Sequence, residues 1–283
     1  MVIRGLRVIR PSAIVVYRLL GGKRFVLHVG NGLSEHVYTG RAYEPTESRF
    51  VESFLQEGDF AVDIGANVGY FSMLMSHAVG AAGCVASVEP GSGTYLLLSE
   101  TIKALRLQNI VALPFAAWNC NELLTFFEST VGDDAQQSFF QRNKTVGKTT
   151  QRVVPAFSSD HLFATSIFKN KSPCLIKIDV EGAEPHVIEG LRSTILDAKP
   201  ILLVEMNDES LEAAGSSRVV LIKSLSVNHD LYYTKLCWPS WWTDQDKFER
   251  FETMPNTIRE ANLLCIPKHG VNRERALTLL ASQ

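Results

Sequence analysis

The sequence has few of the features that mark secreted, membrane-spanning or nucleic-acid-binding proteins. Its five cysteines are scattered over 283 residues without a C-x-x-C pair, which is typical of buried thiols in a reducing compartment. The formal net charge of −2 leaves no basic excess, so we expect no nucleic-acid partner. No uninterrupted apolar run reaches the roughly 18 residues of a membrane span, and we expect no signal peptide. These absences predict a cytoplasmic protein without a transmembrane segment.

The composition supports a sizeable folded core. Hydrophobic residues make up 46% of a chain of 283 residues, a length that fits one large domain or one domain with a small extension. Residues 23–29 alternate apolar and polar side chains, and residues 34–38 are a possible hairpin partner across a Gly-Asn-Gly turn. We therefore predict a small N-terminal β-extension over residues 1–45 and a main domain over residues 46–283.

Residues 60–70, FAVDIGANVGY, join a short apolar run to a glycine-rich turn. The run ends at Asp63 and is typical of a buried strand. Beyond the turn, apolar side chains recur at helical spacing, at Phe71, Leu74, Met75 and Ala78. The stretch predicts a strand, a turn and a helix. Such a turn exposes bare backbone and unpaired N–H groups, and both favour ligand binding.

The residues of this turn narrow the choice of ligand. The dinucleotide fingerprint needs glycine at its first, third and sixth positions, but counting from Gly65 the third is Asn67 and the sixth is Tyr70. The pattern is instead D-x-G-x-N-x-G, which begins with the carboxylate of Asp63. A carboxylate is unfavourable beside a pyrophosphate and favourable beside a cation, so S-adenosylmethionine, with its ammonium and sulfonium, suits the turn. The simpler alternative is an ordinary strand-to-helix turn with a helix cap.

Strand-like and helix-like segments alternate along the rest of the chain. This alternation predicts an α/β fold with a mostly parallel, doubly wound sheet. Residues 128–159 are polar and lack strong periodicity, so we expect a long loop there. A loop of this length is either functional or disordered, and of the two we favour a flap on the substrate side. The expected strands are 60–62, 84–88, 110–118, 123–127, 175–179, 200–204, 231–236 and 262–266, and the expected helices are 48–56, 93–107, 183–199, 207–228 and 271–280.

Acidic residues stand at the ends of several expected strands, where ligands bind in an open parallel sheet. Glu89 follows the glycine-rich turn by about 20 residues, the distance at which a carboxylate holds ribose hydroxyls in nucleotide folds, although a helix-capping role is the alternative. In the segment K-x-D-x-E-G-A-E, Lys177 and Asp179 lie on one side of a strand. Because a lysine on a core strand needs a partner, we expect both to form part of a pocket floor rather than only a salt bridge.

Several segments together resemble one family. VDIGANVGYFS, SVEP, LIKIDVEGAEPHVIEG, ILLVEMN and NLLCIP are similar to the FkbM-type S-adenosylmethionine-dependent methyltransferases, over about residues 43–268. The resemblance implies a Rossmann-like methyltransferase fold whose last strand runs antiparallel. It also implies O-methylation of a hydroxyl on a sugar or natural product, with a small molecule or glycan as acceptor. Residues 128–159 and 237–254 match no family pattern, so we expect them to select the acceptor.

Resemblance and position together assign roles to the residues. We expect Glu89 to bind the ribose and the backbone near Ala116 to border the adenine. The residues expected to cradle the methionine part of the cofactor are Asp63, Gly65, Ala66, Asn67 and Gly69.

The acceptor hydroxyl must lose a proton as it attacks the methyl group. Asp179 is our first candidate for receiving that proton or orienting the acceptor, with Lys177 and Glu181 steering. An ordinary aspartate is a weak base for a sugar hydroxyl, so a divalent metal held by Asp179, Glu181 and Glu205 stays open as an alternative and is not asserted. Two other functions stay open: a catalytically silent cofactor-binding scaffold and a nicotinamide-dependent dehydrogenase.

Overall fold

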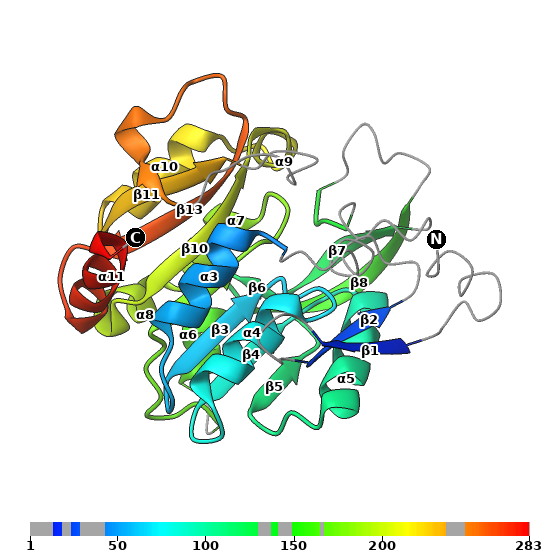
Figure 1. Ribbon diagram of the computed structural model, residues 1–283. Helices are drawn as coiled ribbons and strands as arrows, with labels where there is room; N and C mark the ends of the chain where they lie inside the picture. The colour runs from blue at the N-terminus through cyan, green and yellow to red at the C-terminus, as the bar shows by residue number, and fades with distance from the viewer. Residues whose placement is uncertain are drawn as a thin grey trace, which may run out of the picture.

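A computed structural model describes residues 14–18, 24–28, 43–129, 137–140, 149–164, 167–235 and 247–282 (Figure 1). Its centre is an eight-stranded sheet in the order β12-β11-β13-β10-β9-β3-β4-β5. Neighbouring strands from β10 to β5 run parallel, whereas β13 runs antiparallel between β10 and β11. This confirms the predicted mostly parallel sheet with an antiparallel last strand. The strands are β3 (Phe60–Ile64), β4 (Cys84–Val88), β5 (Ile110–Leu113), β9 (Leu175–Ile178), β10 (Ile201–Asn207), β11 (His229–Lys235), β12 (Glu249–Arg250) and β13 (Glu260–Pro267).

Helices cover both faces of this sheet because its central strands are apolar on both sides. One face packs against α3 (Pro45–Phe54), α4 (Tyr70–Val79), α5 (Ser92–Leu105) and α11 (Val271–Ala281), and α3 and α4 cross in front of the sheet in Figure 1. The helices on the opposite face are α6 (Ser159–Phe163), α7 (Glu184–Gly190), α8 (Arg192–Ala198), α9 (Asp208–Ala213) and α10 (Arg218–Ser226). The predicted doubly wound arrangement is confirmed.

Two of the predicted long helices are each broken in two. Residues 183–199 form α7 and α8, because the carboxylate of Asp160 on α6 accepts hydrogen bonds from the backbone N–H groups of Ser193 and Thr194 and so caps a new helix start. Residues 207–228 form α9 and α10, whose first turns are capped by the side chains of Asn207 and Ser217. The Asp160 cap comes from a distant part of the chain, so local periodicity could not reveal it.

A second, three-stranded sheet lies beside the main one. It has the order β6-β8-β7, with β6 (Ala116–Trp118), β7 (Glu122–Ser129) and β8 (Thr149–Ser158). The predicted strand at 123–127 is confirmed as β7, and the predicted strand at 110–118 is divided between β5 and β6. The prediction of a loop over all of residues 128–159 was wrong, since β8 fills its last third. Pairing with β7 on one side and β6 on the other holds β8 extended, and that pairing is invisible in local sequence.

The N-terminal β-extension contains an antiparallel pair, β1 (Ile14–Arg18) and β2 (Arg24–His28). β2 falls within the predicted strand at 23–29, but the partner seen here is β1, and the expected partner at 34–38 lies outside the described residues. Val26 packs into the same apolar cluster as α3 and α4. The division of the chain at residue 45 stays a prediction. Within the described part of the chain, the helices are all too short or too polar to cross a membrane.

Candidate functional site

The glycine-rich turn lies at the carboxyl edge of the sheet, between β3 and α4. The backbone N–H groups of Gly65 and Ala66 both donate to the carbonyl of Val88 at the end of β4, at 2.9 and 3.0 Å. Gly65 has φ +82°, and a Cβ atom there would collide with the backbone carbonyl of Asp179 after β9. Glycine is therefore required twice over, by conformation and by space. Because Gly65 has no side chain, the turn lies in direct contact with the Asp179 backbone.

Asn67 sits at the centre of the turn with a left-handed backbone, φ +50°. Its N–H donates to the Glu89 carboxylate at 2.8 Å. Its side-chain Oδ1 atom is enclosed and accepts no hydrogen bond. A buried acceptor without a donor is costly unless a ligand supplies one. The cofactor ammonium would supply such a donor, so this turn fits the methionine part of S-adenosylmethionine.

Asp63 lies beneath this turn rather than in it. Only 1% of its surface is exposed, and it accepts a 2.6 Å hydrogen bond from Ser72 on α4, which in turn accepts one from Ser87 on β4. Burial raises the pKa of Asp63, although neighbouring Lys177 opposes the shift. The contacts of Asp63 thus tie β3, α4 and β4 together below the predicted methionine site.

Glu89 stands at the end of β4 and is held by three protein donors. Its carboxylate accepts from the backbone N–H groups of Asn67 and Gly91 and from the hydroxyl of Thr94, each at 2.8 Å. An ionised carboxylate has about four acceptor positions, so one is left for a ribose hydroxyl. Burial raises the pKa of Glu89 to about 7, against the lowering effect of these hydrogen bonds. Glu89 therefore shapes the turn as well as facing the predicted ribose site.

Ala116, the residue predicted to border the adenine, lies on β6 and is buried against Ala156 of β8. Two residues along the same strand, Trp118 stacks on His186 of α7, with ring centroids 4.1 Å apart. Phe139 lies 5.3 Å from Trp118 between ring centroids. The adenine assignment stays a prediction. The aromatic cluster beside it had no signal in the sequence, because its members come from elements far apart in the chain.

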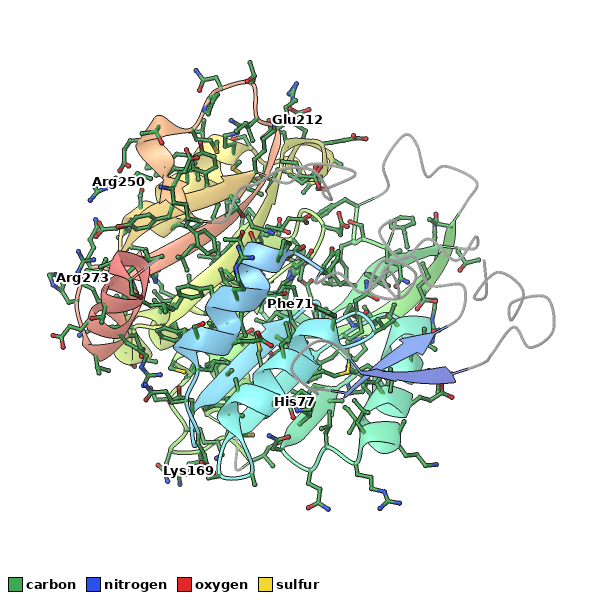
Figure 2. The ribbon with its side chains drawn as sticks, in the orientation of Figure 1. Phe71, His77, Lys169, Glu212, Arg250 and Arg273 are labelled. Atoms are coloured by element: carbon green, nitrogen blue, oxygen red, sulfur yellow. The ribbon has the colours of Figure 1, made fainter. Side chains whose placement is uncertain are left out.

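Lys177 and Asp179 lie on one side of the sheet edge, as predicted, and form an ion pair, while their place in a pocket floor stays a prediction. The Lys177 Nζ atom donates to Asp179 Oδ2 at 2.6 Å, and only 6% of the Lys177 side chain is exposed. The same ammonium lies 4.7 Å from the ring centroid of Phe71 on α4, which Figure 2 labels near the centre of the molecule. Burial disfavours its charge, but Asp179, Glu44 and Asp63 outweigh burial and raise the pKa of Lys177. The carboxylates around Lys177 therefore favour its charged form.

Tyr43 and Glu44, directly before α3, also belong to this charged cluster, a role that was not predicted from the sequence. Burial raises the pKa of Glu44 to about 8, although Lys177 lowers it, and its Oε2 atom is enclosed without a hydrogen-bond partner. The charge of Glu44, with burial and Asp179, raises the pKa of Tyr43 well above its usual value. Their backbone is fixed to α4, since Tyr43 N–H donates to the Tyr70 hydroxyl at 3.1 Å. Both residues fall at the end of the predicted extension, residues 1–45, and nothing in the local sequence indicated this role.

Asp179, Glu181 and Glu205 come together at the same edge. Each offers a carboxylate oxygen within 4.8 Å of the others, so the three could hold a divalent cation. Burial, and then the charges of Asp179 and Glu181, raise the pKa of Glu205 well above its usual value. Glu184, in contrast, accepts hydrogen bonds from the N–H groups of Val180 and Gly182 and so caps the turn itself. The structure brings together every acceptor-side residue that the sequence predicted.

Comparison with known families gives a match over most of the main domain. The family model described as Methyltransferase FkbM domain matches residues 63–235. This range contains every predicted cofactor-binding and catalytic residue. Among curated proteins, none matches the sequence.

Solved structures of methyltransferases match this chain at low sequence identity. A methyltransferase FkbM from Methylobacillus flagellatus is 13% identical with a TM-score of 0.46, and the match covers 75% of this chain and 44% of that one. A putative rRNA methylase from Clostridium thermocellum is 10% identical with a TM-score of 0.47, covering 82% and 98%. An S-adenosylmethionine-dependent O-methyltransferase from Thermotoga maritima is 12% identical with a TM-score of 0.43, covering 91% and 79%.

Proposed function

This chain belongs to the FkbM family of S-adenosylmethionine-dependent methyltransferases, and from that premise we propose that it methylates a hydroxyl group of a sugar or natural-product-like acceptor. Membership makes S-adenosylmethionine the cofactor and removes the dehydrogenase alternative. The acceptor class is our inference from the charged cluster. A polyhydroxylated acceptor offers donors to the several carboxylates that line this edge of the sheet.

One observation carries the proposal. The Gly65 backbone touches the backbone carbonyl of Asp179, so the predicted methionine site and the Lys177–Asp179 pair are immediate neighbours. A transferring methyl group leaves from the methionine end of the cofactor. A carboxylate and an ammonium beside that end can orient the acceptor hydroxyl and accept the proton that it loses.

Each residue of the site has a separate role in the proposed reaction. Bound S-adenosylmethionine supplies a methyl group that its sulfonium already activates. Asn67 and the turn backbone hold the methionine part, and Glu89 holds the ribose. Asp179 accepts the proton that the acceptor hydroxyl loses as its oxygen gains the methyl group. Lys177 keeps Asp179 oriented through its 2.6 Å hydrogen bond.

One feature of the site and one of the described chain as a whole bear on details of the proposal. The carboxylates of Asp179, Glu181 and Glu205 would suit a divalent cation, which would lower the pKa of a bound hydroxyl and relieve Asp179 of acting as the sole base. The cysteines within the described residues, Cys84, Cys120, Cys174 and Cys265, are free thiols, in keeping with a proposed cytoplasmic location.

The test is transfer of a labelled methyl group to a panel of acceptors. The panel contains methyl glycosides and hydroxylated natural-product fragments, with primary amines and an RNA oligonucleotide as other acceptor classes. Each reaction is run with magnesium and with a chelator. We expect O-methylated products and S-adenosylhomocysteine from the hydroxylated group alone. Transfer to the amines or RNA would contradict the proposed acceptor, and cofactor binding without turnover on any acceptor would favour the silent scaffold.

A further inference from the structure

Residues 137–140, which we call the strap, cross between the two halves of the candidate site. The strap pairs with β7: Ser138 N–H donates to the Phe127 carbonyl at 3.1 Å, and Phe127 N–H donates to the Ser138 carbonyl at 2.9 Å. Its Gln137 side chain lies near Gly91 and Glu89, and its Ser138 side chain contacts the turn after β9. The strap is therefore in a position to touch both halves.

At the ribose end, the Gln137 side chain lies against Gly91. A Cβ atom on Gly91 would collide with Gln137 Oε1 and would lie 2.8 Å from Glu89 Oε1. The Gln137 amide and the Glu89 carboxylate thus both border the position that a side chain at residue 91 would occupy, and only glycine leaves that position empty. An amide offers both a donor and an acceptor, whereas the carboxylate offers only acceptors. A pair of this kind suits two neighbouring ribose hydroxyls.

At the acceptor end, Ser138 supports the turn that carries Glu181. Ser138 is 3% exposed, and its hydroxyl donates to the backbone carbonyl of Glu181 at 2.9 Å. Glu181 has a left-handed backbone, φ +55°, which is unfavourable for a residue with a side chain. Such a conformation persists only where the surroundings hold it. The hydrogen bond from Ser138 is one of the contacts that hold the Glu181 backbone in this conformation, and Ser138 belongs to a different segment of the chain.

The aromatic residues of the strap fix its position. Phe139 packs against Phe126 and Trp118, with ring centroids 4.8 and 5.3 Å away. Phe140 lies 6.3 Å from the ring of His186 on α7, the helix that follows the Glu181 turn. These contacts make the strap part of a packed aromatic cluster.

We propose that the strap is a cofactor-binding and positioning element: Gln137 binds the cofactor ribose beside Glu89, and Ser138 holds the Glu181 turn in the position that the acceptor requires. The inference rests on the assignment of Glu89 to the ribose in the proposed function. It needs no knowledge of the acceptor. It can therefore be tested with S-adenosylhomocysteine alone, which carries the same ribose.

The first arm measures S-adenosylhomocysteine affinity by calorimetry. Gln137→Ala removes one neutral hydrogen-bonding group, so the dissociation constant should rise about 3- to 10-fold. Gln151→Ala, an exposed glutamine on β8, is the matched control and should stay within about 2-fold of wild type. Equal affinity of Gln137→Ala and wild type would overturn the ribose contact. No binding by the wild type would overturn the cofactor site itself.

The second arm follows hydrogen–deuterium exchange of residues 180–184 with and without S-adenosylhomocysteine. Ligand binding should slow exchange there in the wild type and in Ser99→Ala, which removes a comparable 2.8 Å serine-to-carbonyl hydrogen bond on α5. It should not do so in Ser138→Ala. Ser138→Cys, which preserves side-chain size but donates weakly, covers the case in which the alanine variant does not fold. Wild-type protection in a folded Ser138 variant would overturn the coupling, whatever the acceptor proves to be.

Discussion

The backbone carbonyl of Asp179 lies against the α-carbon of Gly65, with no room between them for even one methyl group. β3 and β9 are adjacent parallel strands, and the ladder continues one residue past the end of β9, because Asp179 N–H donates to the Ile64 carbonyl at 3.0 Å. The end of one strand therefore sets the position of the other's functional turn. This contact joins the predicted cofactor half of the site to the predicted acceptor half.

Gly65→Ala should disrupt both halves together. The left-handed backbone alone should lower the free energy of unfolding by about 1–3 kcal/mol, and the collision with Asp179 adds to that loss. S-adenosylhomocysteine affinity should fall in the molecules that remain folded. Chemical denaturation and calorimetry on one preparation measure both effects.

The matched control is Gly93→Ala. Gly93 lies in the first turn of α5 with open space around its α-carbon, so alanine should be neutral or should stabilise by about 0.5–1 kcal/mol. If Gly65→Ala behaved like Gly93→Ala, the close contact would not constrain the protein in solution.

Cofactor affinity should depend on the ionisation of Glu89. Burial raises the pKa of Glu89 to about 7, so the group changes from neutral to ionised as the pH rises through that value. An ionised carboxylate accepts a stronger hydrogen bond from a ribose hydroxyl, and S-adenosylhomocysteine should bind roughly 5- to 10-fold more tightly at pH 8 than at pH 6. Glu89→Gln should bind more weakly at pH 8 and lose most of this pH dependence. A variant with wild-type affinity across the range would remove Glu89 from the ribose site.

Asp179→Asn should reduce turnover far more than cofactor binding. The amide cannot take a proton, so the single-turnover rate should fall on the order of 10²–10⁴-fold per folded molecule. The variant should also melt earlier, because buried Lys177 loses its partner. If Asp179 binds a metal instead, a chelator should reproduce the loss in the wild type and magnesium should reverse it.

Asp230→Asn serves as the control for a lost ion pair. Asp230 pairs with Arg273 at the same 2.6 Å, on β11 and α11. Because both side chains of this pair are partly exposed, Asp230→Asn should lower the free energy of unfolding by at most about 1 kcal/mol and leave the methyl-transfer rate unchanged. A folded Asp179→Asn protein with a near-normal rate would exclude Asp179 as the base, and Glu181 would be tested next.

Stability should fall as the pH rises toward neutrality. Burial raises the pKa of Glu184 from 4.5 to about 7, so between these values the folded state keeps a proton that the unfolded state has released. The unfolded state binds fewer protons in this window, and the free energy of unfolding must decrease with pH there, by about 3 kcal/mol at most for this group. Glu184→Gln should flatten that part of the curve. Urea denaturation between pH 4 and 8 measures the slope, and an unchanged slope would contradict the assignment.

The main sheet and the residues gathered at its carboxyl edge could be predicted from local sequence patterns. Asp63, Glu89 and Asp179 stand where apolar runs end, and in a parallel sheet such ends gather at one edge whatever the loops do. The Lys177–Asp179 pair followed from their spacing of two on a strand, because residues at that spacing share a face. These features are local, so periodicity and strand ends were enough to place them.

Tertiary structure decided the features that join distant segments. β8 is a strand because β6 and β7 pair with it on both sides, although its own sequence pattern predicts a loop. α8 begins where it does because Asp160 caps it from another helix. Glu44 lies in the charged cluster because α3 packs against α4. Ser138 contacts the Glu181 turn because the strap pairs with β7. Such contacts depend on which surfaces meet after folding, and no local pattern of residues encodes them.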